Sequence, residues 1–542
     1  MFFVGVAIFG VILSPVVSDL IVNLPDGSIE GHQMLSSENK SFYAFHGIPY
    51  ASPPVGELRF QPPIPPQPWS GIRNASEEGA SCFFLIDYFP DGRPIREDCL
   101  FINVYTPSWN ISEQLPVMFW IHGGGFVTGS GSYKYYGPDY LLEENVIVVT
   151  FNYRLGPFGF LSTGDKAILG NVGLKDQLLA LKWTKTNIAL FGGDPEKITI
   201  FGESAGGMSI GLHLLSQKSS GLFRAAICHS GCSLSVTYQL EAKSFIYQLA
   251  QVLDNNISEN NTTEHIRDFL LKQSAEDLND ASAYVDVHGF VPTLEIDDEE
   301  AFISDPNYEL LVSGRFNQVP LILGTNSEES LSFLTSLENA KSAAQTFDED
   351  STELIPTTWN LLPDSNRTFV GELIRNAYVG NNGSFLVNLA KTLEYSTDNI
   401  FRRATIKQAE LASNYTSVYM YQFSFYGTKS LPNYKVEGAG KVAHFDELAY
   451  LFKMEPYPIG TDADLLTRRR FTKLWTNFAK TLNPTPDESE LLQNITWPKV
   501  TADNIQYLDI DESLVAKSPN MGEFTTWSKI YDTYEAHPLI VF

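Results

Sequence analysis

The segment ITIFGESAGG, residues 198–207, contains a serine in a setting that suits nucleophilic chemistry. Ser204 lies in the pattern G-x-S-x-G, with Gly202 before it and Gly206 after it. The apolar residues before it predict a strand, and Ser204–Leu215 predicts a helix. Two glycines let the backbone pass closely on both sides of a serine that is held in a strained conformation with its oxygen exposed. Ser204 is therefore the candidate nucleophile of an acyl-transfer reaction.

A glycine run could supply the hydrogen-bond donors that such a reaction requires. The apolar run Leu115–Ile121 predicts a buried strand, and the sequence HGGGF follows it at residues 122–126. Acyl transfer creates a negatively charged oxygen, which backbone N–H groups can stabilise. We expect the N–H groups of Gly124, Gly125 and Ala205 to form this oxyanion hole.

The serine also needs a general base, and the sequence contains nine histidines. In sheets with this type of turn the catalytic histidine comes last along the chain, after the acid. His444, in GAGKVAHFDELAYLF, follows a glycine-rich stretch and precedes an apolar helical one, which is typical of a loop above a sheet. His122 and His213 fit packing roles better, and His537 lies too near the chain end. His444 is therefore the predicted base.

An acidic residue should orient this histidine and stabilise its protonated form. The predicted strand VPLIL is followed by GTNSEES, residues 324–330, which contains Glu328 and Glu329. Both glutamates lie after a strand and between Ser204 and His444 in the chain. The spacing alone leaves either of them as the acid.

The elements around these motifs alternate between strands and helices. Residues 146–151, 198–201, 225–228, 319–323 and 418–425 predict further strands, residues 175–190 a helix, and GGDP at 192–195 a turn. Near the start, LIVNLPDGSIEGH predicts a hairpin. This series predicts an α/β fold with a large, mostly parallel sheet covered by helices on both faces. No linker divides the chain, so we expect residues 19–542 to form one domain.

Composition excludes several classes of protein. Of the 542 residues 43% are hydrophobic and 13% aromatic, which is enough for a large core and excludes general disorder. The formal net charge is −27, which disfavours nucleic acid and anionic membranes as partners. The four cysteines lack paired C-x-x-C spacing, so no zinc module is indicated.

The N-terminus predicts export from the cell. Residues 1–18 carry no charge, and their apolar run is too short for a membrane span but suits a signal peptide cut before Asp19. No later run predicts a membrane anchor. Ten N-x-S/T sequons agree with a secreted glycoprotein. They begin at Asn39, Asn74, Asn110, Asn256, Asn260, Asn261, Asn366, Asn382, Asn414 and Asn494.

With these motifs in place, the chain resembles the type-B carboxylesterases of the carboxylesterase/cholinesterase family, and most of all their secreted insect members. The blocks that carry the resemblance span nearly the whole chain. They are GIPYASPPVGELRF, EDCLFINVYTP, NYRLGPFGFLSTGD, GNVGLKDQ, NIALFGGDP, FGESAGG, GTNSEE and WTNFAKTLNPTP. The resemblance implies an α/β-hydrolase fold and a Ser-His-Glu triad.

The resemblance also assigns individual residues. The family pattern G-x-N-x-x-E places the acid at Glu329, so Glu328 is expected to face solvent. The pattern H-x-x-E supports His444 and adds Glu447 as a carboxylate behind the triad. Ser330 departs from the glycine that usually follows the acid. Glu203, before the nucleophile, stands where juvenile hormone esterases typically carry glutamine.

The four cysteines follow the family only in part. Cys82 and Cys99 match its N-terminal disulfide, whereas Cys228 and Cys232 match no second bridge. We expect the latter two to be buried thiols.

Together these features predict a secreted serine esterase that needs no metal or organic cofactor and acts on a small-molecule ester. The loop between Cys82 and Cys99 lacks the tryptophan with which cholinesterases stack on a quaternary ammonium, so the expected substrates are uncharged. Juvenile hormone esterase specificity is a less favoured alternative because of Glu203. A non-catalytic adhesion protein of the same family is a further alternative, which the complete triad and missing membrane span disfavour.

Overall fold

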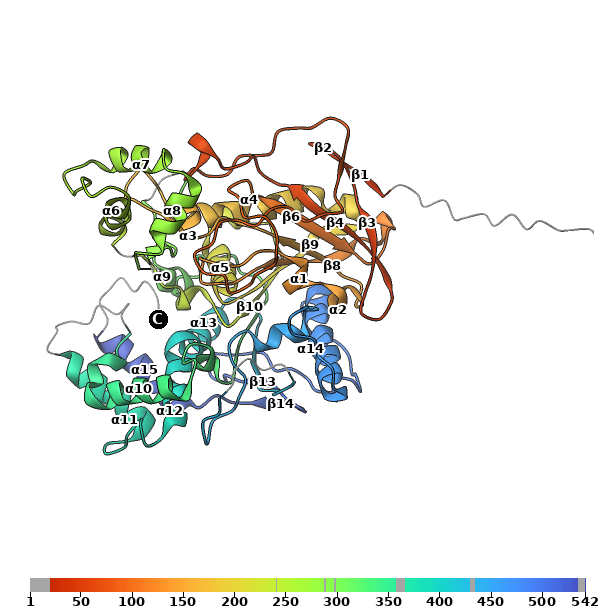
Figure 1. The fold of residues 1–542 in the computed structure, drawn as a ribbon. Helices are drawn as coiled ribbons and strands as arrows, with labels where there is room; N and C mark the ends of the chain where they lie inside the picture. The colour runs from red at the N-terminus through yellow and green to blue at the C-terminus, as the bar shows by residue number, and fades with distance from the viewer. Residues whose placement is uncertain are drawn as a thin grey trace, which may run out of the picture.

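A large central sheet organises the molecule (Figure 1). The structure is a computed structural model that describes residues 20–239, 241–286, 289–296, 299–356, 366–428, 434–534 and 542. The 11 strands of the sheet are, in spatial order, β14 (Leu514–Lys517), β13 (Tyr507–Ile510), β12 (Val418–Phe423), β11 (Leu321–Asn326), β10 (Ala225–His229), β9 (Gly193–Glu203), β7 (Leu115–Ile121), β8 (Ile147–Phe151), β6 (Phe101–Thr106), β4 (Ser41–Pro49) and β3 (His32–Leu35). A second sheet of three strands contains β1 (Ile21–Leu24), β2 (Gly27–Glu30) and β5 (Ile72–Asn74).

The middle of the large sheet is parallel. Every neighbouring pair from β13 across to β8 runs parallel. Strands β14, β6, β4 and β3 join antiparallel at the two edges. The predicted α/β fold with a mostly parallel sheet is confirmed, and the parallel strands bring their carboxyl ends to one edge, where loops can form a site.

Helices cover both faces of this sheet. Side chains of β7 alternate between two apolar clusters, because successive residues of a strand point to opposite faces. Phe119 packs in the cluster that includes α4 (Val172–Asn187) and α5 (Ala205–Leu215), whereas Trp120 packs in the one that includes α14 (Asp462–Thr481). The remaining α-helices are α1 (Tyr133–Tyr136), α2 (Asp139–Leu142), α3 (Gly156–Phe160), α6 (Ala242–Leu253), α7 (Thr263–Leu271), α8 (Ala275–Ser282), α9 (Asn307–Val312), α10 (Leu337–Glu349), α11 (Arg367–Val379), α12 (Leu389–Thr397), α13 (Arg403–Ala412) and α15 (Met521–Tyr534).

Most predicted elements lie close to their observed bounds, and two differ. Strands β1 and β2 form the predicted hairpin, and β7 has the predicted bounds. The predicted turn at 192–195 is wrong for its last three residues, because Gly193 already pairs with Leu115 and belongs to β9. Strand β11 ends at Asn326 rather than at residue 323, since pairing with β12 continues to Phe423.

The structure contains the predicted disulfide, and glycosylation of the sequons stays a prediction. Cys82 and Cys99 form a disulfide with an S–S distance of 2.08 Å, and Cys228 and Cys232 are buried free thiols. Asn261 and Asn366 are partly buried, and the other eight sequon asparagines are exposed. The predicted signal peptide, residues 1–18, lies outside the described residues. Within the described part of the chain, no helix combines the length and apolar character needed to cross a bilayer.

Candidate active site

The turn that carries Ser204 joins the end of β9 to the start of α5. Ser204 itself has φ 57° and ψ −125°, a backbone conformation that a non-glycine residue rarely adopts and that costs free energy. The neighbouring strand β7 leaves no room for side chains here. A Cβ atom on Gly206 would lie 2.1 Å from the carbonyl oxygen of Ile121, and one on Gly202 would lie 2.6 Å from it. The two glycines of G-x-S-x-G are therefore required by close backbone contact.

The glycine run after β7 lies directly against this turn. A Cβ atom on Gly123 would lie 3.0 Å from that of Ser204, so the two segments are in contact. Gly124 has φ 106°, and its carbonyl oxygen accepts hydrogen bonds from the N–H groups of Val127 and Thr128, which closes the run into a tight turn. Gly124, Gly125 and Ser204 line one cavity. The backbone thus places the predicted oxyanion donors beside the predicted nucleophile.

His444 lines the same cavity and is bound to Glu329. Its Nδ1 atom lies 2.6 Å from Oε2 of Glu329, a carboxylate that is fully buried. The other oxygen of Glu329 accepts hydrogen bonds of 2.6 Å from Ser230 Oγ and from the N–H of Asn326. Phe401 stacks on the imidazole, with ring centroids 4.7 Å apart and an interplanar angle of 13°. These contacts fix both the position and the orientation of the imidazole ring.

Glu328 binds a different part of the histidine loop. Its carboxylate accepts hydrogen bonds from the N–H groups of Gly440, at 3.0 Å, and Val442, at 3.4 Å, and from the hydroxyl of Ser327. It therefore stabilises the backbone that leads to His444 and does not contact the imidazole.

The structure shows how the acid loop accommodates Ser330, a residue larger than glycine. The side chain is buried, and its hydroxyl donates a hydrogen bond of 2.9 Å to the carbonyl oxygen of Leu393 in α12. The N–H of Ser330 donates to Thr397 Oγ1 at 3.2 Å. These two hydrogen bonds tie the acid loop to α12.

Glu203 lies on the other side of the imidazole. Its Oε1 atom is 2.9 Å from Nε2 of His444, and its side chain is buried. Burial raises the pKa of Glu203 to about 7, although attraction to His444 opposes this shift. Burial alone would lower the pKa of His444, but the two glutamates outweigh it and hold the pKa well above the ordinary value. Because the two groups interact this strongly, they titrate as a coupled pair.

Glu447 contacts the acid loop from behind the triad. Its carboxylate accepts a hydrogen bond of 2.5 Å from Nδ2 of Asn326, which also donates to the carbonyl oxygen of Ala443, at 2.7 Å. Asn326 therefore connects the end of β11 to the residue before His444. It is the asparagine of the G-x-N-x-x-E pattern, so sequence could have indicated it, whereas Ser230 lies in no motif that could have done so.

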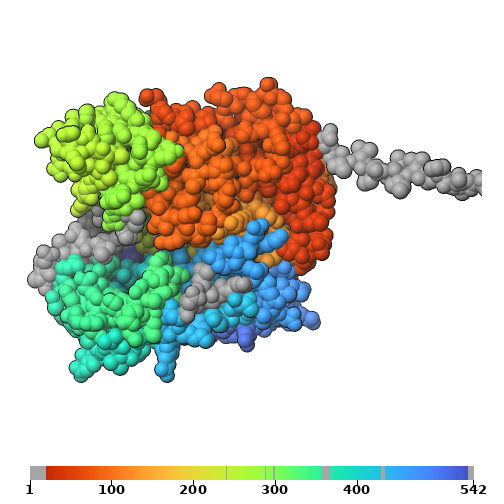
Figure 2. All heavy atoms as spheres, viewed as in Figure 1, coloured from red at the N-terminus to blue at the C-terminus, as the bar shows by residue number. Residues whose placement is uncertain are grey.

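The cavity around these residues has a volume of about 790 Å³. Figure 2 shows a furrow between an upper part, coloured red to yellow-green, and a lower part, coloured green to blue, and residues of both parts line the cavity. Its apolar and aromatic lining is formed by Ile86, Tyr88, Phe89, Phe126, Val127, Met208, Val291, Leu331, Phe333, Ile400, Phe401, Phe445 and Tyr457. Among the described residues only Glu203 and His444 bring ionisable acid or imidazole groups to the lining. Such a cavity suits an uncharged, apolar ligand.

Comparison with known proteins places the chain in a class that fits this geometry. Residues 18–527 match the profile of the Carboxylesterase family. A juvenile hormone esterase of Tribolium castaneum is 34% identical over 502 residues, 87% of this chain and 84% of that protein. An acylcarnitine hydrolase of Mus musculus is 32% identical, over 94% of this chain and 91% of that protein. A crystal structure of juvenile hormone esterase from Manduca sexta, with OTFP covalently attached, superposes with a TM-score of 0.82 at 31% identity, covering 95% of this chain and all of that one.

A sheet of this topology, with a serine turn and a glycine run at one edge, defines an α/β-hydrolase. The chain belongs to the carboxylesterase family and is a carboxylic ester hydrolase.

Proposed function

We propose that the protein is a secreted serine esterase that hydrolyses uncharged carboxylic esters through Ser204, His444 and Glu329. The observation that carries the proposal is that His444, bound to Glu329 through Nδ1, lines the same cavity as the strained Ser204. The covalent OTFP on the Manduca sexta relative supports a covalent route.

The first half of the reaction forms an acyl-enzyme. Ser204 Oγ attacks the ester carbonyl carbon while Nε2 of neutral His444 accepts its proton. The N–H groups of Gly124, Gly125 and Ala205 stabilise the resulting oxyanion. The tetrahedral intermediate collapses, the C–O bond to the alcohol breaks, and His444 donates its proton to the departing oxygen.

The second half returns the enzyme to its starting state. Water donates a proton to His444 and attacks the acyl carbon, and collapse of the new tetrahedral intermediate releases the acid and reprotonates Ser204. Glu329 keeps the N–H of the imidazole on Nδ1 and stabilises the imidazolium in both halves. The Glu203 carboxylate lies 2.9 Å from Nε2, where its charge stabilises the imidazolium.

The cavity lining determines the expected substrates. Its large apolar surface favours esters with an extended hydrocarbon group, and no tryptophan of the described lining offers an ammonium group a stacking partner. Juvenile hormone, the ester after which two of the relatives are named, is a second candidate substrate because the cavity is large and apolar.

Removal of the nucleophile tests the proposal. Ser204→Ala should lower kcat for p-nitrophenyl esters by on the order of 10³- to 10⁶-fold with the fold retained, because loss of the nucleophile leaves only binding and the oxyanion hole. An organophosphate should label Ser204 in the wild type and nothing in the variant. Near-wild-type kcat in a folded Ser204→Ala protein would reject the assignment.

Expression with the intact N-terminus tests secretion. The culture medium should contain a protein that begins at Asp19 and loses mass on treatment with an endoglycosidase. Retention of residues 1–18 on an intracellular protein would contradict this part of the proposal.

A further inference from the structure

Two segments that are distant in sequence form adjacent parts of the cavity wall. The loop between Cys82 and Cys99 contributes Ile86, Tyr88 and Phe89. The segment 124–127 contributes the neighbouring part of the wall. It contains two of the predicted oxyanion donors, Gly124 and Gly125, and is called the oxyanion segment below. The width of the cavity at this point therefore depends on how the loop is held against the oxyanion segment.

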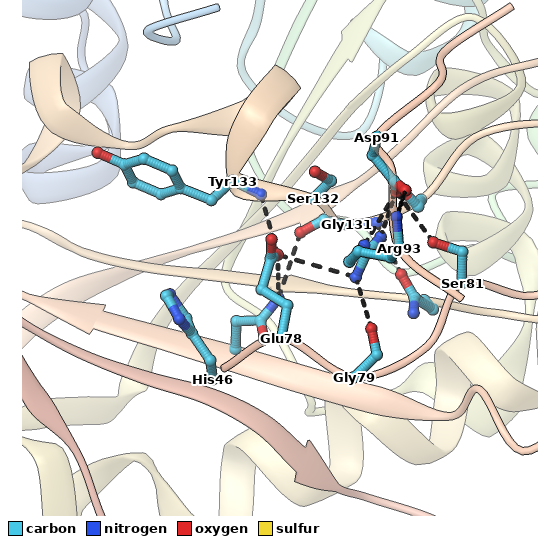
Figure 3. Close-up of polar contacts among 12 residues, drawn as sticks. His46, Glu78, Gly79, Ser81, Asp91, Arg93, Gly131, Ser132 and Tyr133 are labelled. Carbon is cyan, nitrogen blue, oxygen red and sulfur yellow. Dashed lines mark hydrogen bonds and ion pairs between the residues drawn. The ribbon is translucent and has the colours of Figure 1, made fainter. Parts of the chain in front are cut away.

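A buried polar cluster at the end of the loop makes this connection (Figure 3). Oδ2 of Asp91 accepts hydrogen bonds from Ser81 Oγ, at 2.9 Å, and from Ser130 Oγ, at 2.8 Å. Arg93 binds the same carboxylate through Nε and Nη2, at 2.9 and 2.7 Å. Ser81 belongs to the base of the loop, whereas Ser130 lies three residues after the end of the oxyanion segment. Asp91 thus joins the two parts of the wall through one oxygen atom.

Arg93 and Glu78 complete the cluster. The Arg93 guanidinium donates to the carbonyl oxygen of Gly79 at 3.2 Å and lies 3.8 Å from Oε1 of Glu78. Glu78 in turn accepts a hydrogen bond of 2.9 Å from the N–H of Tyr133, the first residue of α1 (Figure 3). The side chains of Asp91, Arg93 and Glu78 are only 8%, 11% and 16% exposed. Charges this buried are tolerated because each one is paired and hydrogen-bonded.

The contacts of the loop with the rest of the site show what the cluster controls. The N–H of Leu85 donates to the carbonyl oxygen of Val127 at 2.9 Å, which is a backbone link between the two segments. Phe89 packs on Phe445, the residue after His444, with centroids 5.2 Å apart. Tyr88 is 65% exposed, whereas Phe89 also packs on Tyr135 and the carbonyl oxygen of Pro90 accepts a hydrogen bond of 2.5 Å from Lys134 Nζ. The Asp91–Ser130 hydrogen bond is a side-chain link between this end of the loop and the chain that follows the oxyanion segment.

We propose that Asp91, held by Arg93 and bound to Ser130, is a positioning residue that sets the Cys82–Cys99 loop against the oxyanion segment and so determines how large an ester the cavity accepts. This inference rests on the proposed esterase function. A small ester is held at Ser204 and the oxyanion donors and does not need the loop. A long hydrocarbon chain packs on the wall that the loop forms.

Two serines provide a matched test, because both are buried and both donate to the same oxygen of Asp91. Ser130→Ala breaks the bridge between loop and oxyanion segment, whereas Ser81→Ala removes a hydrogen bond at the base of the loop and leaves the bridge intact. We would measure kcat and KM for p-nitrophenyl esters of increasing acyl length and for acetates of increasing alcohol length. Thermal unfolding of both variants controls for lost stability.

Ser130→Ala should raise KM for the longest esters of one of the two series by about tenfold, the effect of losing roughly one methylene contact in an apolar pocket. KM and kcat for the shortest ester should stay within about twofold of wild type, since binding of the long chain alone is affected. Ser81→Ala should lower the midpoint of thermal unfolding by about as much as Ser130→Ala does. Its effect on KM should not depend on the length of the ester. Equal changes at every chain length, or equal chain-length dependence in both variants, would overturn the proposal.

Asp91→Asn provides a second measurement. It removes the nearer of the two charged partners of Arg93, so we expect a larger chain-length effect than in Ser130→Ala if the variant folds. Should it not fold, the two serine variants decide the question alone. Failure of the esterase function itself would be distinguishable, since the wild type would then turn over none of the esters.

Discussion

The turn at Ser204 and the Cys82–Cys99 loop form parts of the same cavity, but different forces hold them. The turn is packed backbone against backbone, so that even a methyl group on Gly202 or Gly206 would overlap with Ile121. The loop is held mainly by side chains and by a covalent bond, together with the backbone hydrogen bond from Leu85 to Val127. Besides Asp91 and its disulfide, the loop is anchored where Arg59 binds Glu97 through two hydrogen bonds, of 2.6 and 2.7 Å.

This difference indicates how the molecule separates chemistry from substrate choice. Steric exclusion between backbone segments holds Ser204 and the oxyanion donors in one arrangement, because close-packed interiors do not deform gradually. Polar and aromatic side-chain contacts hold the loop, and each of these can change without altering the turn. Changes at the triad should therefore act on kcat, and changes in the loop on KM and stability.

The largest effect on kcat is expected from a substitution of the catalytic acid, Glu329. Glu329→Gln should lower kcat by about 10⁴-fold, as the analogous change in a serine protease triad does, because an amide can hold the wrong imidazole tautomer and offers no charge to the imidazolium. Steady-state kinetics on a short ester measures this effect, and KM should change little. A fall in kcat below tenfold would show that another group orients His444.

Removal of the disulfide tests the other region. Replacing Cys82 and Cys99 together by serine should lower the free energy of unfolding by about 3 kcal/mol, the contribution of a bridge that closes a loop of this size. Because the turn at Ser204 does not depend on the loop, kcat for a short ester at low temperature should be retained. Denaturant unfolding with and without a reductant measures the effect, and the reductant should destabilise the wild type but not the double variant.

A retained unfolding midpoint in the double variant would contradict this prediction. An equal loss of kcat for short and long esters would also remove the distinction between the two regions.

The pH dependence of kcat/KM tests Glu203. Only neutral imidazole accepts the serine proton, and the pKa of His444 is raised, so the acid limb of the profile should lie above the value of about 6.5 for an unperturbed histidine. Glu203→Gln removes a negative charge from Nε2, which lowers the pKa of His444 and moves the limb to lower pH. Profiles measured from about pH 5 to 9 show the direction.

Glu437→Gln is the matched control for this prediction. Glu437 is exposed on the same loop as His444, where solvent screens its charge, so the acid limb should not move. An unchanged limb in Glu203→Gln would mean that Glu203 does not control the protonation of His444 in the working enzyme.

The smallest expected effect is at Glu328. Glu328→Gln keeps one oxygen that can accept from Gly440 or Val442, so kcat should fall only by about threefold through a looser histidine loop. The same assay as for Glu329→Gln measures it, which makes the two adjacent substitutions a matched pair. A reversal of the two effects would identify Glu328 as the acid.

Sequence reasoning predicted the local parts of this site well. The strand, turn and helix around Ser204 and the position of the glycine run followed from glycine spacing and apolar runs. The structure has β7 and α5 at nearly the predicted bounds, whereas β9 is longer at both ends than predicted. The assignment of Glu328 to the solvent was wrong, since it binds the histidine loop. Nothing in the sequence indicated Ser230, which follows the neighbouring strand β10 and whose hydroxyl donates to Glu329.

The sequence by itself determined the backbone conformations, because steric limits on glycine and on apolar periodicity act within a few residues. It also determined which side chains are able to perform acyl transfer. Only the tertiary structure decided that Glu329 meets His444, across 115 positions of chain, and that Asp91 meets Ser130. Such contacts depend on strand register and on the packing of whole segments, which arise only when the sheet is assembled.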